Sequence, residues 1–311
     1  METRSASKQR NFAKNDTSRK SRKKPLPEPT HVGHFISILI ISLCKKILHI
    51  DTEVKIGIYL GGVLIGSVFS DIISLPKTYF SDKKNLLNQF FVHFGFGWTF
   101  LLLTGYIFLT CFVTYSGNWK PVIRKHLTRL VITTFWWYAM TNTFSYIDKV
   151  VGVCSLSSHK KKYDCLKAGR SWLGFDISGH VFLLIHNLLT ISEEVKSFKN
   201  WTKLGAMLKE EDLPSKKNLS ELQISQARIF YRNLTPVIKI IIVLLALWTL
   251  FCEIMLVTSV VYRFHTMTQK IAAAVVSVVC WFITYRVILE SKVDVFPVQP
   301  GQSPLNYMKL K

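Results

Sequence analysis

The sequence has few acidic residues and few cysteines, and its first thirty residues contain no apolar segment. Its 311 residues include 19 Asp and Glu against 40 Lys and Arg, which gives a formal net charge of +21. That charge would favour nucleic-acid binding in a soluble protein. The six cysteines contain no Cys-x-x-Cys pair of the metal-binding type, and no internal repeat is visible. The polar, basic start predicts that no cleavable signal peptide opens the chain.

Apolar residues, by contrast, make up 49% of the chain and are clustered in long runs. Runs of about 20 apolar residues are long enough to cross a bilayer as helices, and such continuous runs differ from the alternating pattern of a barrel strand. A run at about 178–192 is the shortest and the weakest. The other five runs span residues 56–75, 90–115, 130–147, 236–261 and 271–289. The sequence therefore predicts an all-α, polytopic membrane protein with six transmembrane helices.

The six runs divide the chain into three regions. Residues 1–33 form a basic tail whose composition is typical of disorder, residues 34–292 form the membrane domain, and residues 293–311 form a second tail. Within the membrane domain, the apolar segment 34–50 is interrupted by two lysines. It predicts an N-terminal amphipathic helix that lies at the membrane surface without crossing it.

The distribution of Lys and Arg predicts the orientation of the membrane domain. With six spans and both termini cytosolic, the cytosolic side holds about 28 of the 40 basic residues, against about 11 on the luminal side. The connection at 193–235 then lies in the cytosol. Basic residues beside a membrane bind anionic lipid headgroups, so we expect membrane lipids, and no nucleic acid, as the partners of this charge.

The cysteines fall into two groups. Four of them lie in apolar segments, where a small buried thiol is the usual interpretation. Cys154 and Cys165 share the loop at 148–173, which the predicted topology places in the lumen. An oxidising lumen permits a disulfide there, and the sequence leaves open whether the two cysteines are joined.

Two histidines are expected at the luminal surface. His180 lies in "GFDISGHVFLL" (174–184), at the luminal start of the fourth span. His265 lies in the very short connection between the fifth and sixth spans, which is luminal as well. An isolated histidine at a membrane interface is often only an amphipathic anchor, but the shared depth favours a functional role for this pair.

The residues before His180 suit the binding of an anion. A helix N-terminus offers unpaired N–H groups and the positive end of the helix dipole. Ser178 or Asp176 is expected to cap this helix, and Gly179 lets a phosphate approach the backbone. Ser178 and Gly179 are therefore candidate substrate-binding residues.

Several motifs in the same order resemble the fat storage-inducing transmembrane (FIT) proteins of the endoplasmic reticulum. The likeness covers residues from about 55 to 290. The motifs are "YFSDKKNLLNQFFVHFGFGWTF" (79–100), "WWYAMTNTFSYID" (136–148), "GFDISGHVFLL" (174–184), "SEE" (192–194) and "VYRFHTMTQK" (261–270). FIT proteins are in turn similar to lipid phosphate phosphatases. The resemblance implies six spans with both termini cytosolic.

The same resemblance implies an activity and two catalytic residues. It implies a fatty acyl-CoA diphosphatase of the endoplasmic reticulum membrane that supports lipid droplet formation and lipid homeostasis. Such an enzyme gives acyl 4′-phosphopantetheine and adenosine 3′,5′-bisphosphate. His265 is then the nucleophile and His180 the general acid, and no metal or other cofactor is needed.

The chain departs from the phosphatase pattern in two respects. It lacks the phosphatase motifs that supply Lys and Arg, and no acid follows His265 until Glu290. Candidate replacements for the phosphate-binding cations and donors are Lys83, Lys84, Asn85 and Arg263. For the lysines, an interfacial anchoring role is the alternative.

A non-enzymatic function is the rival hypothesis. The resemblance also implies binding of neutral lipids, so the protein could partition diacylglycerol and triacylglycerol during droplet budding. That function needs only an apolar groove between spans. Asn142 or Thr143, among the aromatic residues of the third span, could then hold a glycerol or ester group.

Overall fold

The computed structural model describes residues 32–308 with short gaps. The gaps are residues 74–75, 77, 80–81, 83–84, 156–160, 211–218, 263, 292–296 and 306. The predicted disordered tail lies almost entirely outside the described residues, as do Lys83, Lys84 and Arg263.

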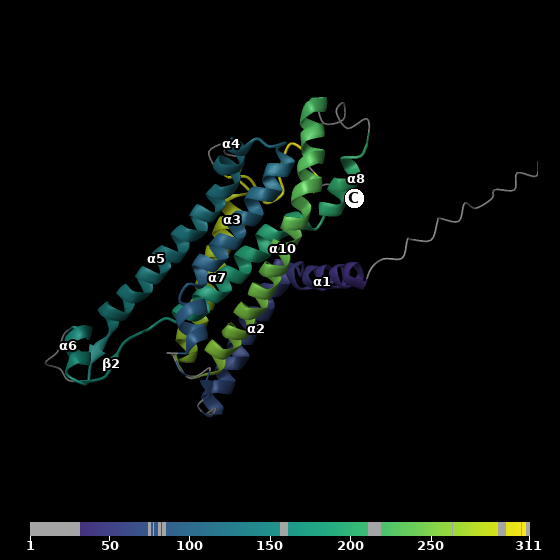
Figure 1. The fold of residues 1–311 in the computed structure, drawn as a ribbon. Helices are drawn as coiled ribbons and strands as arrows, with labels where there is room; N and C mark the ends of the chain where they lie inside the picture. Colours follow the sequence, from purple (N-terminus) through teal and green to yellow (C-terminus); the bar gives the residue numbers. More distant parts are fainter. Residues whose placement is uncertain are drawn as a thin grey trace, which may run out of the picture.

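The described chain is almost entirely helical (Figure 1). Its helices are α1 (Val32–Leu48), α2 (Thr52–Ile72), η2 (Leu87–Val92), α3 (Gly95–Thr114), α4 (Trp119–Pro121), η3 (Val122–Leu127), α5 (Thr128–Val151), α6 (Lys162–Lys167), α7 (Gly179–Glu194), η4 (Val195–Phe198), α8 (Trp201–Met207), α10 (Glu221–Val261), α11 (Met267–Phe282) and η5 (Ile283–Ile288). The two short strands, β1 (Val153–Cys154) and β2 (Trp172–Leu173), pair antiparallel.

Four helices of the described chain are long and apolar enough to cross a bilayer. They are α2, α3, α10 and the continuous helix formed by α11 and η5 (Met267–Ile288). The prediction of a multi-pass helical membrane protein is therefore confirmed. The count of six spans stays a prediction, because α7 has only 16 residues and α5 is less apolar.

Helix α7 occupies the centre of the bundle, which explains its weak hydropathy. It packs against α11, α10, α3 and α2, and every residue from Val181 to Val195 is buried. A helix surrounded by protein does not face lipid, so it tolerates polar side chains that find partners among its neighbours. His186 is one example, since its Nε2 lies 3.1 Å from the carbonyl oxygen of Thr133 on α5. The two ends of the bundle are named here the His180 end and the Glu194 end, after the residues near the two ends of α7.

Helices α2 and α10 run side by side in close contact. A Cβ at Gly66 would lie 2.7 Å from Val260 Cγ1, so only glycine permits this approach. Further along the same pair, Tyr59 donates a hydrogen bond of 2.9 Å to Glu253. Helix α10 has 41 residues, which is about 61 Å at 1.5 Å per residue. It therefore extends well beyond a hydrocarbon core of about 30 Å.

Helix α1 runs across the direction of α2 and α10 and projects from the side of the bundle (Figure 1). Its side chains Phe35, Leu39 and Leu43 are 63%, 59% and 59% exposed. Helix α1 covers most of the predicted segment 34–50, and the interfacial amphipathic helix at the membrane surface stays a prediction.

A buried ion pair joins α5 to the Glu194 end of α7. Arg129 donates from Nε and Nη2 to the two carboxylate oxygens of Glu194, at 2.8 and 2.6 Å. Tyr285 Oη donates to the same carboxylate at 3.1 Å. The neighbouring Glu193 accepts from Trp281 Nε1 at 3.2 Å and pairs with Lys196 at 2.8 Å. These two carboxylates therefore hold the end of the central helix in place.

The chain segment 297–308 folds back onto this end of the bundle. Arg129 Nη1 donates to Val298 O at 2.8 Å, and the buried Tyr307 donates to Ser197 O at 2.9 Å. Asn200 Nδ2 donates to Met308 O at 3.2 Å. The described residues of the predicted second tail thus contact α5, η4 and the start of α8.

Candidate active site

The first turn of α7 is capped as the sequence predicts. Ser178 is the N-cap, and its hydroxyl accepts from Val181 N at 3.5 Å. The Ser178 side chain is fully buried, so it serves the helix, and its role in substrate binding stays a prediction. Asp176, the other predicted cap, contacts His265 instead.

The space in front of this helix end is open. A Cβ built at Gly179 would have no heavy atom within 4 Å, and the next residue, His180, is exposed. The N-terminal end of α7 at Gly179 and His180 therefore borders open space. The positive end of the helix dipole favours an anion there.

His265 packs against the loop that leads into α7. Its Nδ1 lies 3.0 Å from the carbonyl oxygen of Asp176 and 3.7 Å from the Asp176 carboxylate. Because a carbonyl can only accept a hydrogen bond, Nδ1 carries the proton in this arrangement. The lone pair of the neutral ring is then on Nε2, which is the form that a nucleophile requires.

Two further hydrogen bonds hold the loop 174–178 to the start of α11. Ser178 N donates to Gln269 O at 3.4 Å, and Gln269 Nε2 donates to Gly174 O at 3.5 Å. Gln269 also accepts from Thr266 N at 3.0 Å and so completes the capping box of α11. The segment containing His265 and the loop leading into His180 are therefore in contact at one end of the bundle.

The sequence does not reveal the partner of His265. It shows that no acid closely follows this histidine, whereas the structure supplies a carboxylate and a carbonyl from Asp176, 89 residues earlier in the chain. Gln269 is a second residue that the sequence does not identify. The available signal is that Asp176 and His180 share one short motif, and that His265 and Gln269 share another.

The loop is also anchored on its other side, at the end of α5. Trp172 Nε1 donates to Asp148 O at 3.1 Å, and the Asp148 carboxylate pairs with Lys162. A Cβ at Gly174 would lie 2.2 Å from Asp148 Oδ1. Gly174 is therefore needed for the loop to leave β2 close to α5.

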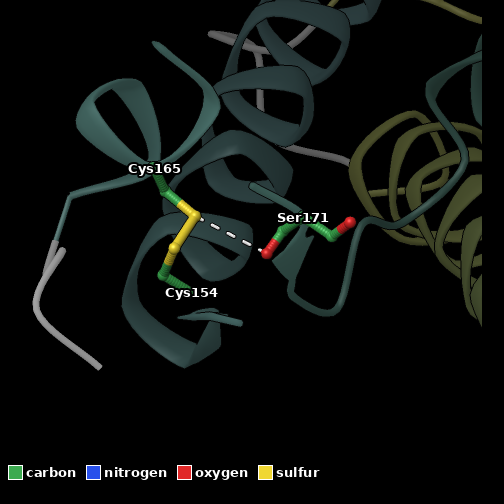
Figure 2. The surroundings of a disulfide bond; sticks show 3 residues. All are labelled: Cys154, Cys165 and Ser171. Carbon is green, nitrogen blue, oxygen red and sulfur yellow. Dashed lines mark hydrogen bonds between the residues drawn. A yellow bond between two sulfur atoms is a disulfide. The ribbon is translucent and has the colours of Figure 1, made fainter. Parts of the chain in front are cut away.

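A disulfide closes the hairpin from which this loop emerges (Figure 2). It joins Cys154 on β1 to Cys165 on α6, with a Cα–Cα distance of 5.8 Å. Cys165 Sγ also lies 3.5 Å from Ser171 O, one residue before β2. The bond that the sequence leaves open is thus formed, and it restrains the start of the site loop.

The remaining predicted site residues are not placed in a common cluster. Asn85 is buried, and its Nδ2 donates to Tyr79 O at 3.0 Å, so its contact with substrate stays a prediction. Lys83, Lys84 and Arg263 lie outside the described residues. Among the residues that are described, no group of three His, Cys, Asp or Glu side chains is arranged to hold a metal ion.

The polar residues predicted for lipid binding on the third span bond to the backbone of their own helix. Asn142 and Thr143 are exposed on α5. Asn142 Nδ2 donates to Tyr138 O at 2.7 Å, and Thr143 Oγ1 donates to Ala139 O at 2.8 Å. Both side chains are thus satisfied by the backbone of their own helix.

Residues 76–285 match the family described as fat storage-inducing transmembrane protein. The chain is 32% identical over 296 residues to a protein of Drosophila melanogaster, which covers 92% of this chain and 70% of that protein. It is 31% identical to proteins of Xenopus tropicalis and Homo sapiens, over 72% of this chain and 78% of each of them. All three relatives are named acyl-coenzyme A diphosphatase FITM2. No solved structure matches the chain significantly.

Proposed function

The chain belongs to the fat storage-inducing transmembrane protein family, and from that premise we propose that it is an acyl-CoA diphosphatase. It hydrolyses the pyrophosphate of fatty acyl-CoA and releases acyl 4′-phosphopantetheine and adenosine 3′,5′-bisphosphate. The observation that carries this proposal is the contact between His265 and the loop leading into His180. The names of the relatives agree with it.

The proposed location is the endoplasmic reticulum membrane, with six spans and both termini in the cytosol. The His180 end then faces the lumen, and the Glu194 end faces the cytosol. The disulfide at the His180 end supports this orientation, because disulfides persist in an oxidising compartment. Helix α1 lies in the cytosolic membrane interface.

In the proposed mechanism, His265 attacks phosphorus through Nε2. A P–N bond forms as the anhydride P–O bond breaks, and His180 gives its proton to the departing phosphate oxygen. Water then cleaves the phosphohistidine while His180 accepts a proton from it. The Nδ1 contact of His265 with Asp176 O keeps the ring oriented through both steps. Covalent catalysis of this kind replaces one difficult step by two easier ones.

The N-terminus of α7 stabilises the charge that develops on the transferred phosphoryl group. This helix end lies beside the open space at Gly179, and the positive end of a helix dipole is a preorganised source of the electrostatic stabilisation that contributes to catalysis at phosphorus. Lys83, Lys84, Asn85 and Arg263 remain the proposed side-chain contacts with the pyrophosphate.

The proposal is tested with the purified full-length protein and oleoyl-CoA. We expect His180→Ala and His265→Ala each to lower turnover at least about 100-fold, since both proton transfer and nucleophilic attack contribute at this scale. His93→Ala is the matched control, because His93 is an exposed histidine near the start of α3, at the same end. Equal turnover in all four proteins would refute the histidine mechanism.

A second function, binding of diacylglycerol or triacylglycerol for droplet budding, is favoured by one observation. A groove of about 410 Å³ lies between α3 and α10 on the lipid-facing side of the bundle. It is lined by Trp98, Leu101, Leu102, Leu244, Leu247, Trp248 and Phe251. Crosslinking of a photoactivatable triacylglycerol to the inactive His265→Ala protein tests this function separately from hydrolysis.

A further inference from the structure

A second groove lies at the Glu194 end, between α8 and the first turns of α10 (both green in Figure 1). Its volume is about 460 Å³. It is lined by Gly205, Leu208, Lys209, Arg228, Ile229, Tyr231 and Arg232. We propose that this groove binds the headgroup of an anionic phospholipid from the leaflet at the Glu194 end.

The walls of this headgroup groove are held together by specific contacts. Tyr231 stacks on Trp201, with ring centroids 5.4 Å apart, and donates to Trp201 O at 3.2 Å. A Cβ at Gly205 would lie 2.4 Å from Tyr231 Oη, so glycine allows α8 to approach α10. Arg228 donates from Nε to Leu208 O and from Nη2 to Glu210 O at 3.4 Å. The groove is thus built between two fixed elements.

The lining of the groove suits both the anionic headgroup and the apolar part of such a lipid. Lys209, Arg228 and Arg232 are exposed, and neither Lys209 nor Arg232 forms a salt bridge with any described residue. Guanidinium groups bind phosphate oxygens in a bidentate manner. Leu208, Ile229 and the long side-chain stems provide an apolar wall for the glycerol region and the first acyl carbons.

The groove begins at the depth of lipid headgroups and extends beyond it, away from the hydrocarbon core. The apolar run of α10 begins at Pro236. Arg232 and Arg228 precede it by one and two helical turns, which is about 6 and 12 Å along the axis. The headgroup layer is about 5–7 Å thick on each side of the hydrocarbon core, so Arg232 lies within this layer and Arg228 lies beyond it, where it can meet a headgroup that projects into water. Basic pockets at this depth on the cytoplasmic side of membrane proteins are typical lipid-headgroup sites.

The test uses the delipidated full-length protein in a neutral detergent. Binding of dioctanoyl phosphatidylserine, dioctanoyl phosphatidylcholine and inorganic phosphate is measured by native mass spectrometry and by the shift in thermal unfolding. The test variant is Lys209→Gln/Arg232→Gln, because neither side chain has a salt bridge to a described residue that the substitution would break. Lys120→Gln/Arg124→Gln is the matched control, since both are exposed cations at the same end.

We expect the parent and the control to bind phosphatidylserine at least tenfold more tightly than phosphatidylcholine. The Lys209→Gln/Arg232→Gln variant loses this preference while keeping its unfolding midpoint without lipid. Equal lipid binding in the variant and the parent would overturn the proposal. Inorganic phosphate that binds as tightly as phosphatidylserine, or self-association blocked by the double substitution, would overturn it as well.

Discussion

Replacement of Arg129 is expected to destabilise the whole bundle. Both carboxylate oxygens of Glu194 are bound by this one guanidinium, at 2.8 and 2.6 Å, and the two side chains are 2% and 0% exposed. Arg129→Met leaves the buried carboxylate without its cation. Breaking a buried pair in this way costs about 3–5 kcal/mol. A domain of this size loses about 2–4 °C per kcal/mol, so the unfolding midpoint falls by about 6–20 °C.

The double variant Arg129→Met/Glu194→Met tests whether the attraction within the ion pair exceeds the cost of burying its two charges. Apolar replacement of a complete buried ion pair is often neutral or stabilising. We therefore expect the double variant to unfold within a few degrees of the parent protein, although each single variant is severely destabilised. Arg286→Gln is the control, because its partners Glu53 and Glu290 have side chains that are 78% and 49% exposed, and such pairs contribute at most about 1 kcal/mol each.

The chain contains its own probe for this measurement. Cys44, Cys111, Cys252 and Cys280 are free and buried, so a thiol-reactive dye labels them only as the bundle unfolds. Thermal labelling curves of the parent, the two single variants and the double variant give a double-mutant cycle. The reasoning is refuted if Arg129→Met unfolds within about 2 °C of the parent, or if the double variant is as unstable as the sum of the single variants.

Three further results are expected. Asp176→Asn lowers kcat/KM by no more than about fivefold, because the carboxylate is 3.7 Å from His265 and 61% exposed; a thousandfold loss would make it a catalytic group. Cys154→Ser/Cys165→Ser removes about 3 kcal/mol of local restraint, so limited proteolysis cuts the hairpin faster while the dye-labelling midpoint of the bundle barely changes. Burial, with Arg129 and Lys125 nearby, lowers the pKa of His126 to about 3. The unfolded chain therefore binds a proton between about pH 6.5 and 3 that the native state excludes, and stability falls as the pH is lowered through this range. His126→Gln should lose less stability between pH 7.5 and 5, and an unchanged pH dependence would contradict this assignment.

The membrane helices could be predicted where lipid itself determines their composition. Residues 236–261 and 271–289 face lipid on one side, so their apolar runs are continuous and easily recognised. The run at 178–192 is weak because α7 is enclosed by other helices. A continuous apolar run indicates a helix that faces lipid, and a central helix has little contact with lipid.

The local part of the site could also be predicted, whereas its long-range part could not. The cap at Ser178 and the open backbone at Gly179 follow from residues that are adjacent in the chain. The contact of His265 with Asp176 joins residues 89 positions apart. The ion pair of Arg129 with Glu194 spans 65 positions. Spacing within one helix carries no information about such contacts, which depend on the way the helices pack.

The weak hydropathy of α7 and the position of the site have the same physical origin. Helix α7 has 16 residues, about 24 Å, which is shorter than a hydrocarbon core of about 30 Å. As a span of the predicted membrane domain, such a short helix is accommodated by the helices that surround it and places one of its ends below the membrane surface. His180, in its first turn, is exposed even so, beside the open space at Gly179. In the proposed mechanism, a site beside this helix end meets a substrate whose acyl chain is in lipid and whose pyrophosphate is in water.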